Sequence, residues 1–271
     1  MPLVKTAELV SPGTGIAAFN VITLEHAEAI VAGAEEAGHP VICQISENAV
    51  RFHHGRLAPI AAATRALAES SSARVALHLD HVTDEALLRQ AADHGFGSVM
   101  YDGSRHDYAE NVARTAEAAA WAHARGLWLE AELGEIGGKD GAHAPGVRTD
   151  PEEAARFTAE TAVDALAVAV GSSHAMTERT ARLDHGLIRR LRDALPVPLV
   201  LHGSSGVPDD ELRRAVAAGM VKINIGTALN KAFTGAVAAH LPSRVDPRAY
   251  LAPARDAMAA TVAHLLRVVS G

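Results

Sequence analysis

Short apolar runs alternate with longer amphipathic stretches along the whole chain. Each run has the length of one β-strand, and near-continuous hydrophobicity is typical of parallel strands that helices cover. The eight predicted strands span residues 16–21, 40–46, 75–80, 97–103, 127–133, 165–171, 198–203 and 221–226.

The stretches between these runs are rich in Ala, Glu and Arg and repeat their apolar residues at helical spacing. Several end in glycine, the residue that commonly follows a helix C-terminus. Clear examples are residues 24–38, 84–95, 109–126 and 209–219. Residues 83–87 and 149–157 each place N-capping side chains before an acidic first turn. The chain is therefore predicted to alternate strands and helices.

Eight strand–helix units predict a (β/α)8 TIM barrel, for which a chain of about 250 residues is typical. A doubly wound open sheet is the main alternative. No Pro/Ser-rich linker or change of composition divides the chain, so we expect residues 1–271 to form one domain.

The composition fits this architecture. The 271 residues are 48% hydrophobic, 21% charged and 4% aromatic, which favours Ala-rich helices packed closely on a sheet. A formal net charge of −7 gives no indication of a nucleic-acid or membrane partner. The lone Cys43 lies in an apolar run, which predicts a buried thiol and a reducing compartment. Neither a signal-peptide pattern nor an apolar run of about 18 residues is present, so we expect a cytoplasmic protein.

Polar side chains recur where the predicted strands end. The pattern is clearest in VALHLDHVTD (75–84), where an apolar run finishes in His78, Asp80 and His81. In a TIM barrel, the C-terminal ends of all strands meet at the face that carries the active site. The polar residues at these ends are Asn20, Ser46, Asp80, His81, Asp102, Ser104, Glu132, His174, His202, Ser204, Ser205, Asn224 and Thr227.

Three histidines that are distant in sequence can converge at this face. His81, His174 and His202 follow three different strands, and three neutral imidazoles beside carboxylates suit a divalent transition metal, zinc above all. Three protein ligands would leave one coordination position open, as in catalytic zinc sites. The chain has 15 histidines, and one at a strand end can also be a hydrogen-bonded structural residue. His78 lies on the same side of its strand as Asp80, with either a packing or a hydrogen-bonding role.

Two glycine-containing strand ends point to an anion. HGSSGVPDDEL (202–212) and NIGTALNKAF (224–233) each present backbone N–H groups and hydroxyls just before a helix, a setting that binds anions. Phosphate sites in TIM barrels commonly follow strands seven and eight, so these segments predict a phosphate site beside the metal. The Gly-rich segment 134–150 suits either a mobile loop over the mouth of the barrel or a solvated connection.

Seven motifs in collinear order resemble the zinc-dependent class II ketose-bisphosphate aldolases, a family that includes the fructose- and tagatose-1,6-bisphosphate aldolases. The resemblance covers nearly the whole chain, and the family fold is the barrel that the strand count predicts. The motifs are AFNVITLEHAEAI (18–30), HLDH (78–81), GFGSVMYDGS (95–104), EAELGEIGG (130–138), DALAVAVGSSH (164–174), PLVLHGSSGVPDDE (198–211) and KINIGTALNKAF (222–233).

The resemblance implies a lyase of carbohydrate metabolism, of the glycolytic type. It would cleave a ketose 1,6-bisphosphate reversibly into dihydroxyacetone phosphate and an aldehyde such as glyceraldehyde 3-phosphate. One catalytic Zn²⁺ per subunit would stabilise the enediolate that forms as the C3–C4 bond breaks. Asp80 matches the acid/base that handles the C4 hydroxyl proton. The family forms homodimers and homotetramers, and one of these is expected here.

The other site residues follow from the motifs in the same way. His81, His174 and His202 match the zinc ligands, and Asp102 and Glu132 match carboxylates that can host the metal in an alternative position. The resemblance also allows a monovalent cation near the phosphate site. The residues that would contact the substrate and its two phosphates are Asn20, Ser46, Ala175, Gly203, Ser204, Ser205, Asn224, Ile225, Gly226, Thr227 and, at the second phosphate, Arg255.

Three departures from the family pattern leave the substrate open. Ala175 replaces a glycine, Asp140 is the nearest equivalent of a loop glutamate that acts as a second acid/base, and no acidic residue follows Thr227 closely. An aldolase for another phosphorylated ketose or keto-acid is therefore one alternative, and a non-catalytic phosphosugar-binding barrel is another. A zinc hydrolase is disfavoured because the first strand lacks a His-x-His pair. No strand end offers a lysine for a Schiff base, and Lys222 is assigned a structural role.

Overall fold

Eight parallel strands close into a barrel in which each strand pairs with the next and β8 pairs with β1. The computed structural model describes residues 2–133, 147–174, 176–241 and 245–271. The strands are β1 (Ile16–Asn20), β2 (Val41–Ser46), β3 (Val75–Val82), β4 (Ser98–Tyr101), β5 (Trp128–Glu132), β6 (Ala165–Ala167), β7 (Leu199–Leu201) and β8 (Met220–Ile225). The predicted TIM barrel is confirmed, with one strand at each predicted position.

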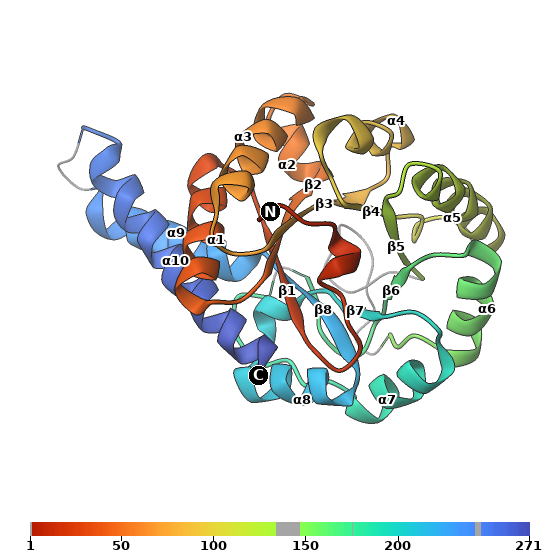
Figure 1. Ribbon diagram of the computed structural model, residues 1–271. Coiled ribbons are helices and arrows are strands. Elements are labelled where there is room, and N and C mark those ends of the chain that lie inside the picture. The colour runs from red at the N-terminus through yellow and green to blue at the C-terminus, as the bar shows by residue number, and fades with distance from the viewer. Residues whose placement is uncertain (1, 134–146, 175, 242–244) are drawn as a thin grey trace.

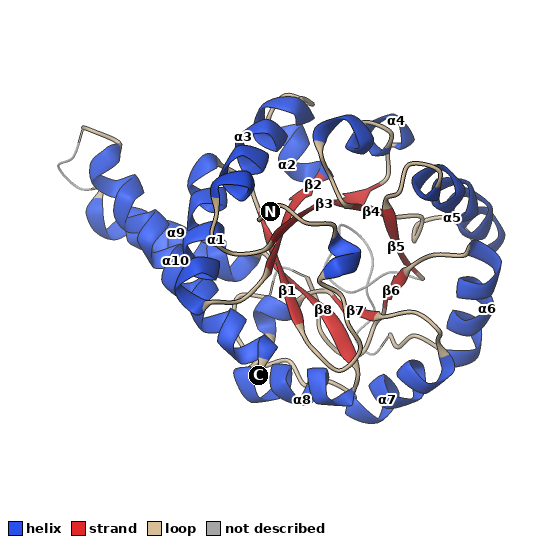
Figure 2. Ribbon diagram, viewed as in Figure 1, coloured by secondary structure: helices blue, strands red, loops and turns tan. Residues whose placement is uncertain are grey.

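Helices surround the ring of strands (Figure 2). The C-terminal α9 and α10 pack on each other and extend beyond the ring on one side (Figure 1). The α-helices are α1 (Leu24–Ala37), α2 (Glu47–Phe52), α3 (Leu57–Ser70), α4 (Glu85–Leu88), α5 (Tyr108–His123), α6 (Pro151–Thr161), α7 (His185–Ala194), α8 (Asp209–Ala218), α9 (Thr227–His240) and α10 (Arg248–Ser270). The 3-10 turns are η1 (Thr6–Glu8), η2 (Ala91–His94) and η3 (Ser204–Gly206).

The main hydrophobic core lies between the outer face of the strands and the helices. Leu77, Leu79, Leu129 and Ile223 are fully buried there, together with other alternate residues of their strands, such as Val75, Ala131 and Ile225. Because alternate side chains of a strand point to opposite faces, the residues between them face the barrel interior. Burial of each large apolar side chain contributes roughly 1.5–3 kcal/mol, so this layer holds the helices on the barrel.

The N-terminal segment, which includes η1, lies over the opening at one end of the ring of strands (Figure 1). Leu9 packs against Ile16 and Ile42 on the interior face, and the Oγ1 of Thr6 lies 2.5 Å from the Oγ of Ser98. These contacts fill the N-terminal end with side chains. The opposite end, where the strands finish, is the one that carries a cavity.

Two further sequence predictions concern single residues and helix character. Cys43 is fully buried, and burial raises the pKa of its thiol to about 12, as befits an inert core residue. Gly38 ends α1 in the left-handed conformation, with a φ of 69°, as expected of a glycine cap. Among the helices of the described ranges, none combines the length and apolar character needed to cross a membrane.

Candidate active site

The end of β3 supplies two functional groups from adjacent positions. Asp80 and His81 both line the cavity at the mouth of the barrel, although neighbouring side chains of a regular strand point to opposite faces. The pairing of β3 with β4 shifts register between Leu79 and Val82, and His81 has a φ of 49°, in the left-handed region. This irregularity turns His81 towards the mouth, so a single strand end delivers a carboxylate and an imidazole.

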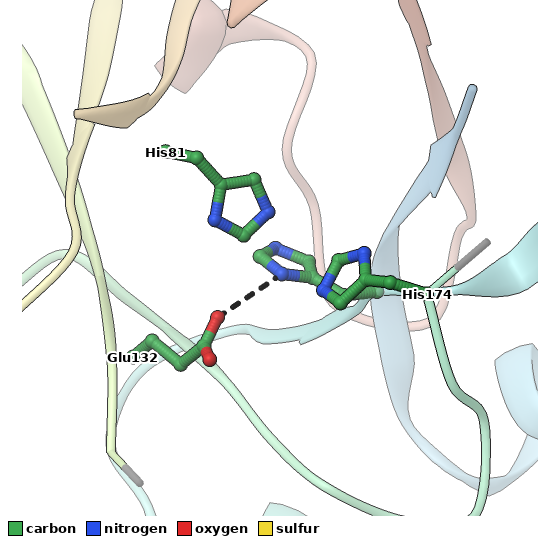
Figure 3. Close-up of side chains that lie close together, drawn as sticks. His81, Glu132 and His174 are labelled. Carbon is green, nitrogen blue, oxygen red and sulfur yellow. Dashed lines mark ion pairs between the residues drawn. The ribbon is translucent and has the colours of Figure 1, made fainter. Parts of the chain in front are cut away.

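Four residues from four strand ends converge beside Asp80. His81, His174 and Glu132 point towards one another (Figure 3), and with His202 they offer four ligand atoms within 4.8 Å of one another. The centroids of the three imidazole rings lie 4.6, 5.2 and 5.6 Å apart. The structure thus brings together the three histidines that the sequence singled out, with Glu132 among them.

The chemistry of this cluster fits a divalent transition metal. Imidazole nitrogens and a carboxylate oxygen are the ligands that zinc takes in catalytic sites. The surroundings also stabilise positive charge at this point. Burial alone would lower the pKa of His202, but hydrogen bonds to Glu130 and Glu132 outweigh it and raise the pKa to about 9. The same negatively charged surroundings would stabilise a cation held by His202 and Glu132.

Asp102 supports the cluster from outside it. Its Oδ2 lies 3.1 Å from the Nδ1 of His81, and its Oδ1 accepts a hydrogen bond from the Oγ of Ser104 at 2.6 Å. A carboxylate on one ring nitrogen orients the imidazole and leaves the other nitrogen for a metal. The four-residue cluster does not include Asp102, so its geometry favours orientation of His81 over direct ligation.

The surroundings of Asp80 keep its carboxylate ionised. Asp80 is 1% exposed, and its Oδ2 accepts a hydrogen bond from the Nδ2 of Asn20 at 3.4 Å. The Nε2 of Gln44 donates to the Oδ1 of Asn20 at 2.9 Å and so sets the orientation of that amide. Burial alone would raise the pKa of Asp80, but electrostatic interactions with His81 and Lys222 outweigh burial and lower it. Asp80 is therefore a buried, ionised carboxylate next to the four-residue cluster.

His78 lies below Asp80 in the barrel interior. Its Nε2 is 3.9 Å from the Oδ1 of Asp80 and 3.8 Å from the Oε2 of Glu130, while its Nδ1 lies 2.7 Å from the Oγ of Ser98. Burial, reinforced by the charge of Lys222, lowers the pKa of His78 to about 3, so the ring is neutral. The structure favours the hydrogen-bonding role for His78 and places it outside the four-residue cluster.

A cavity of about 500 Å³ opens above these groups, a volume within the usual range of small-molecule sites. Most residues predicted to contact metal or substrate line it. These are Asn20, Ser46, Asp80, His81, Asp102, His174, Gly203, Ser205, Asn224, Gly226 and Thr227.

The wall formed after β7 and β8 depends on two glycines. Gly203 has a φ of 68°, and a Cβ there would lie 2.4 Å from the carbonyl oxygen of Ser173. A Cβ on Gly226 would come within 2.8 Å of the Oδ1 of Asn20. The Oγ of Ser205 accepts a hydrogen bond from the backbone N–H of Ala228 at 3.0 Å, in the first turn of α9. The two predicted phosphate segments therefore meet, with the N-terminus of α9 at the cavity.

The structure does not bring every predicted substrate residue to the cavity. The Oγ of Ser204 donates to the carbonyl of Leu201 at 3.1 Å, and the side chain of Ile225 is part of the main core. Arg255 lies on α10 and pairs with Glu28 at 3.5 Å and with Asp256 at 3.1 Å. The assignments of Ser204, Ile225 and Arg255 stay predictions.

Two predicted residues, Asp140 and Ala175, lie outside the described residues. Their roles as a second acid/base and a substrate contact stay predictions as well.

Three charged residues at the mouth were not predicted from the sequence. Arg51, on α2, and Arg105, after β4, both line the cavity. Glu47 forms an ion pair with Arg51 and accepts a hydrogen bond from the backbone N–H of Thr83 at 2.6 Å, which holds the loop after β3. These residues lie beyond strand ends in helices and loops, where the hydrophobic periodicity of the sequence does not indicate which side chains point into the cavity.

Two charged residues inside the barrel were also missed as part of the site. Glu130 and Lys222 are fully buried and form an ion pair at 2.7 Å. The spacing of Glu130 and Glu132 in β5 could have revealed the first, because residues two apart in a strand face the same side. Lys222 had been assigned a structural role alone.

Comparison with known proteins identifies relatives along nearly the full length. The family model "Fructose-bisphosphate aldolase class-II" matches residues 5–271. The chain is 38% identical to the fructose-bisphosphate aldolase of Geobacillus stearothermophilus, with 98% of this chain and 96% of the relative covered. It is 37% identical to the fructose-bisphosphate aldolase of Thermus caldophilus, with coverage of 91% and 90%. The crystal structure of the YdjI aldolase from Escherichia coli K12 superimposes with a TM-score of 0.84 and 31% identity, over 95% of this chain and 92% of that one.

Proposed function

The chain belongs to the class II fructose-bisphosphate aldolase family and is an aldolase, and we propose that it reversibly cleaves a ketose 1,6-bisphosphate with the aid of zinc. The products would be dihydroxyacetone phosphate and an aldehyde such as glyceraldehyde 3-phosphate. The observation that carries the proposal is the four-ligand cluster next to the buried carboxylate of Asp80, with Asp80, His81 and His174 lining one cavity.

His81, His174, His202 and Glu132 would hold the metal, because their ligand atoms already converge. The family is metal-dependent, and a donor set of three imidazoles and a carboxylate favours zinc. When bound, such an ion polarises the ketone carbonyl and offsets the negative charge that develops as C3–C4 breaks.

Asp80 would move the proton of the C4 hydroxyl. Its carboxylate is ionised and buried at the cavity wall, so it can accept this proton as the C3–C4 bond breaks and return it in condensation. The amide of Asn20 donates to the same carboxylate, which fixes its direction. No lysine at a strand end is needed, since the reaction would not pass through a Schiff base.

The segments after β7 and β8 would bind the phosphate of the ketone fragment. Gly203, Gly226 and Thr227 line the cavity wall, and the N-terminus of α9, which begins at Thr227, carries a partial positive charge. A side chain at either glycine would collide with neighbouring atoms. This wall would therefore position the ketone fragment by one end.

The second phosphate would lie near Arg51 and Arg105. Both line the cavity, and guanidinium groups suit phosphate because they donate several hydrogen bonds in a fixed plane. Ser46 also lines this cavity. A substrate with a phosphate at each end would thus span the mouth from the α9 terminus to the arginines.

An assay of aldol cleavage tests the proposal directly. Purified protein is incubated with fructose 1,6-bisphosphate or tagatose 1,6-bisphosphate, and dihydroxyacetone phosphate is measured. We expect activity on one of them, loss of activity on removal of metal with a chelator, and recovery on addition of Zn²⁺. Activity that survives complete metal removal would refute the metal-dependent mechanism. Cleavage confined to another phosphorylated ketose would correct the substrate, and the homodimer or homotetramer stays a prediction that light scattering can test.

A further inference from the structure

Lys222 lies in the barrel interior, and so far it has entered only through its charge, which lowers the pKa of Asp80 and of His78. It is fully buried on β8, and its Nζ lies 2.7 Å from the Oε2 of Glu130 and 2.8 Å from the Oδ1 of Asn224. A buried ammonium without partners is strongly unfavourable, so these contacts stabilise it. The two partners differ in kind, because one is a charge and the other is a neutral amide that lines the cavity.

The contact with Lys222 determines which way the amide of Asn224 points. An ammonium group only donates hydrogen bonds, so the oxygen of Asn224 must face Lys222 and the Nδ2 group must face away. The Nδ2 of Asn224 is buried and has no hydrogen-bond partner among the described residues. Buried donors without partners are rare because they are costly. Since Asn224 lines the cavity, a ligand oxygen there would complete its hydrogen bonding.

The other contact of Lys222 leads to the metal cluster. Glu130 uses its Oε2 for Lys222 and its Oε1 for the Nε2 of His202, at 3.0 Å. This leaves the Nδ1 of His202 facing Glu132, at 3.3 Å. The carboxylate of Glu130 therefore lies between Lys222 and a predicted metal ligand, and its own direction depends on both.

We propose that Lys222 is a positioning residue that serves both halves of the site. It holds Asn224 so that its N–H₂ group donates to the substrate oxygen on which negative charge develops, and it holds His202 through Glu130. The orientation of Asn224, called the substrate arm below, rests on the proposed aldol cleavage. The positioning of His202 through Glu130, called the metal arm below, does not. The simpler alternative is that Lys222 only neutralises Glu130. This alternative predicts an equal effect of N224A in both backgrounds and native Zn²⁺ affinity in the following experiment.

The experiment removes the ion pair as a unit. Lys222→Met alone would leave Glu130 charged and buried, so the variant of interest is K222M/E130Q, which buries no net charge. Asn224→Ala is then introduced into the native protein and into K222M/E130Q. For all four proteins, thermal stability, Zn²⁺ affinity by chelator competition, and kcat and KM for fructose 1,6-bisphosphate (or the tagatose epimer, if only that is cleaved) are measured.

The substrate arm predicts a loss of additivity. In the native protein, N224A should lower kcat about 100-fold, the scale of one donor to a developing oxyanion. In K222M/E130Q the amide of Asn224 is no longer oriented, so kcat is already low. Because N224A then removes a group whose contribution is already lost, it should lower kcat less than about five-fold further. An equal fold-change in both backgrounds would show that Asn224 is oriented without Lys222, and would overturn the substrate arm.

The metal arm has a readout that needs no substrate. K222M/E130Q should bind Zn²⁺ about 10- to 100-fold more weakly, the usual effect of removing a carboxylate behind a ligating histidine. E130D, which keeps the charge but shortens the side chain, should weaken Zn²⁺ binding as well. Native Zn²⁺ affinity in both variants would overturn the metal arm. If the native protein cleaves neither bisphosphate, the proposed function fails while the Zn²⁺ measurement still decides this arm.

Discussion

On β5 and β8, outward-facing and inward-facing side chains are buried to the same extent but differ in polarity. On β5, Leu129 points outward to the helices, whereas Glu130 and Glu132 point inward, and all three are fully buried. On β8, Ile223 faces outward and Lys222 inward in the same way. Burial alone therefore does not distinguish side chains that stabilise the fold from side chains that form the site. The hydrogen-bond and ion-pair partners of each side chain make this distinction.

The outer face and the inner face also differ in what they contribute to folding. Apolar side chains on the outer face gain free energy from leaving water. A buried ion pair such as Lys222–Glu130 recovers at best what desolvation costs, so it adds little net stability. The charged residues of the inner face are therefore best explained by the function they support. Variants on each face should affect different observables.

The largest expected effect comes from the inner face. Asp80→Asn keeps the size of the side chain but removes the base, so kcat should fall by roughly 10²–10⁴, the contribution typical of general acid–base catalysis. Steady-state kinetics with the cleaved bisphosphate measures this change. Zn²⁺ content and thermal stability serve as controls, and both should stay close to native values. A kcat within ten-fold of native would assign proton transfer to another group.

The next effect belongs to the outer face, one residue away from Glu130. Leu129→Ala removes a fully buried side chain and should lower the free energy of unfolding by about 2–5 kcal/mol. Denaturant unfolding measures the loss, with Leu129→Met as a matched control that should cost less than about 1.5 kcal/mol. The folded fraction should keep its Zn²⁺ affinity and kcat. A large loss of kcat with native stability would show that the two faces are coupled.

Sequence patterns predicted the parts of this arrangement that depend on strand position and topology. Eight apolar runs sufficed for the barrel, and the barrel topology brings His81, His174 and His202 to one mouth although they are far apart in the chain. Asp80 followed from the same reasoning. These predictions needed only which strand a residue ends, not how its side chain is oriented.

The parts that could not be predicted depend on exact register and local geometry. His81 reaches the mouth only because β3 is irregular and φ is positive. The Lys222–Glu130 pair joins residues 92 positions apart across the barrel, and no local pattern relates them. Arg51 and Arg105 lie in a helix and a loop after strands, where no sequence pattern indicated them, and the assignment of Arg255 to the second phosphate stays a prediction.

A smaller effect is expected where the inner face meets the mouth. Asp102→Asn should weaken Zn²⁺ binding about 10- to 100-fold, because the carboxylate that orients His81 would lose its charge. Chelator competition with the apoprotein measures this affinity. At saturating Zn²⁺, kcat should recover most of its native value, since Asp102 would act through His81. A kcat that stays low in the zinc-loaded variant would place Asp102 in contact with the substrate instead.

The smallest effect is expected at the outer edge of the cavity. Arg51→Ala and Arg105→Ala should each raise KM for the bisphosphate about ten-fold, at the low end for a charged hydrogen bond because both side chains are exposed to solvent. Fructose 1-phosphate lacks the second phosphate, so KM for its cleavage should stay close to the native value in both variants. Because Arg51 also pairs with Glu47, which holds the loop after β3, Arg105→Ala is the cleaner test. If only Arg255→Ala raised KM for the bisphosphate, the second phosphate would be bound through α10, and the mouth arginines would be ordinary surface residues.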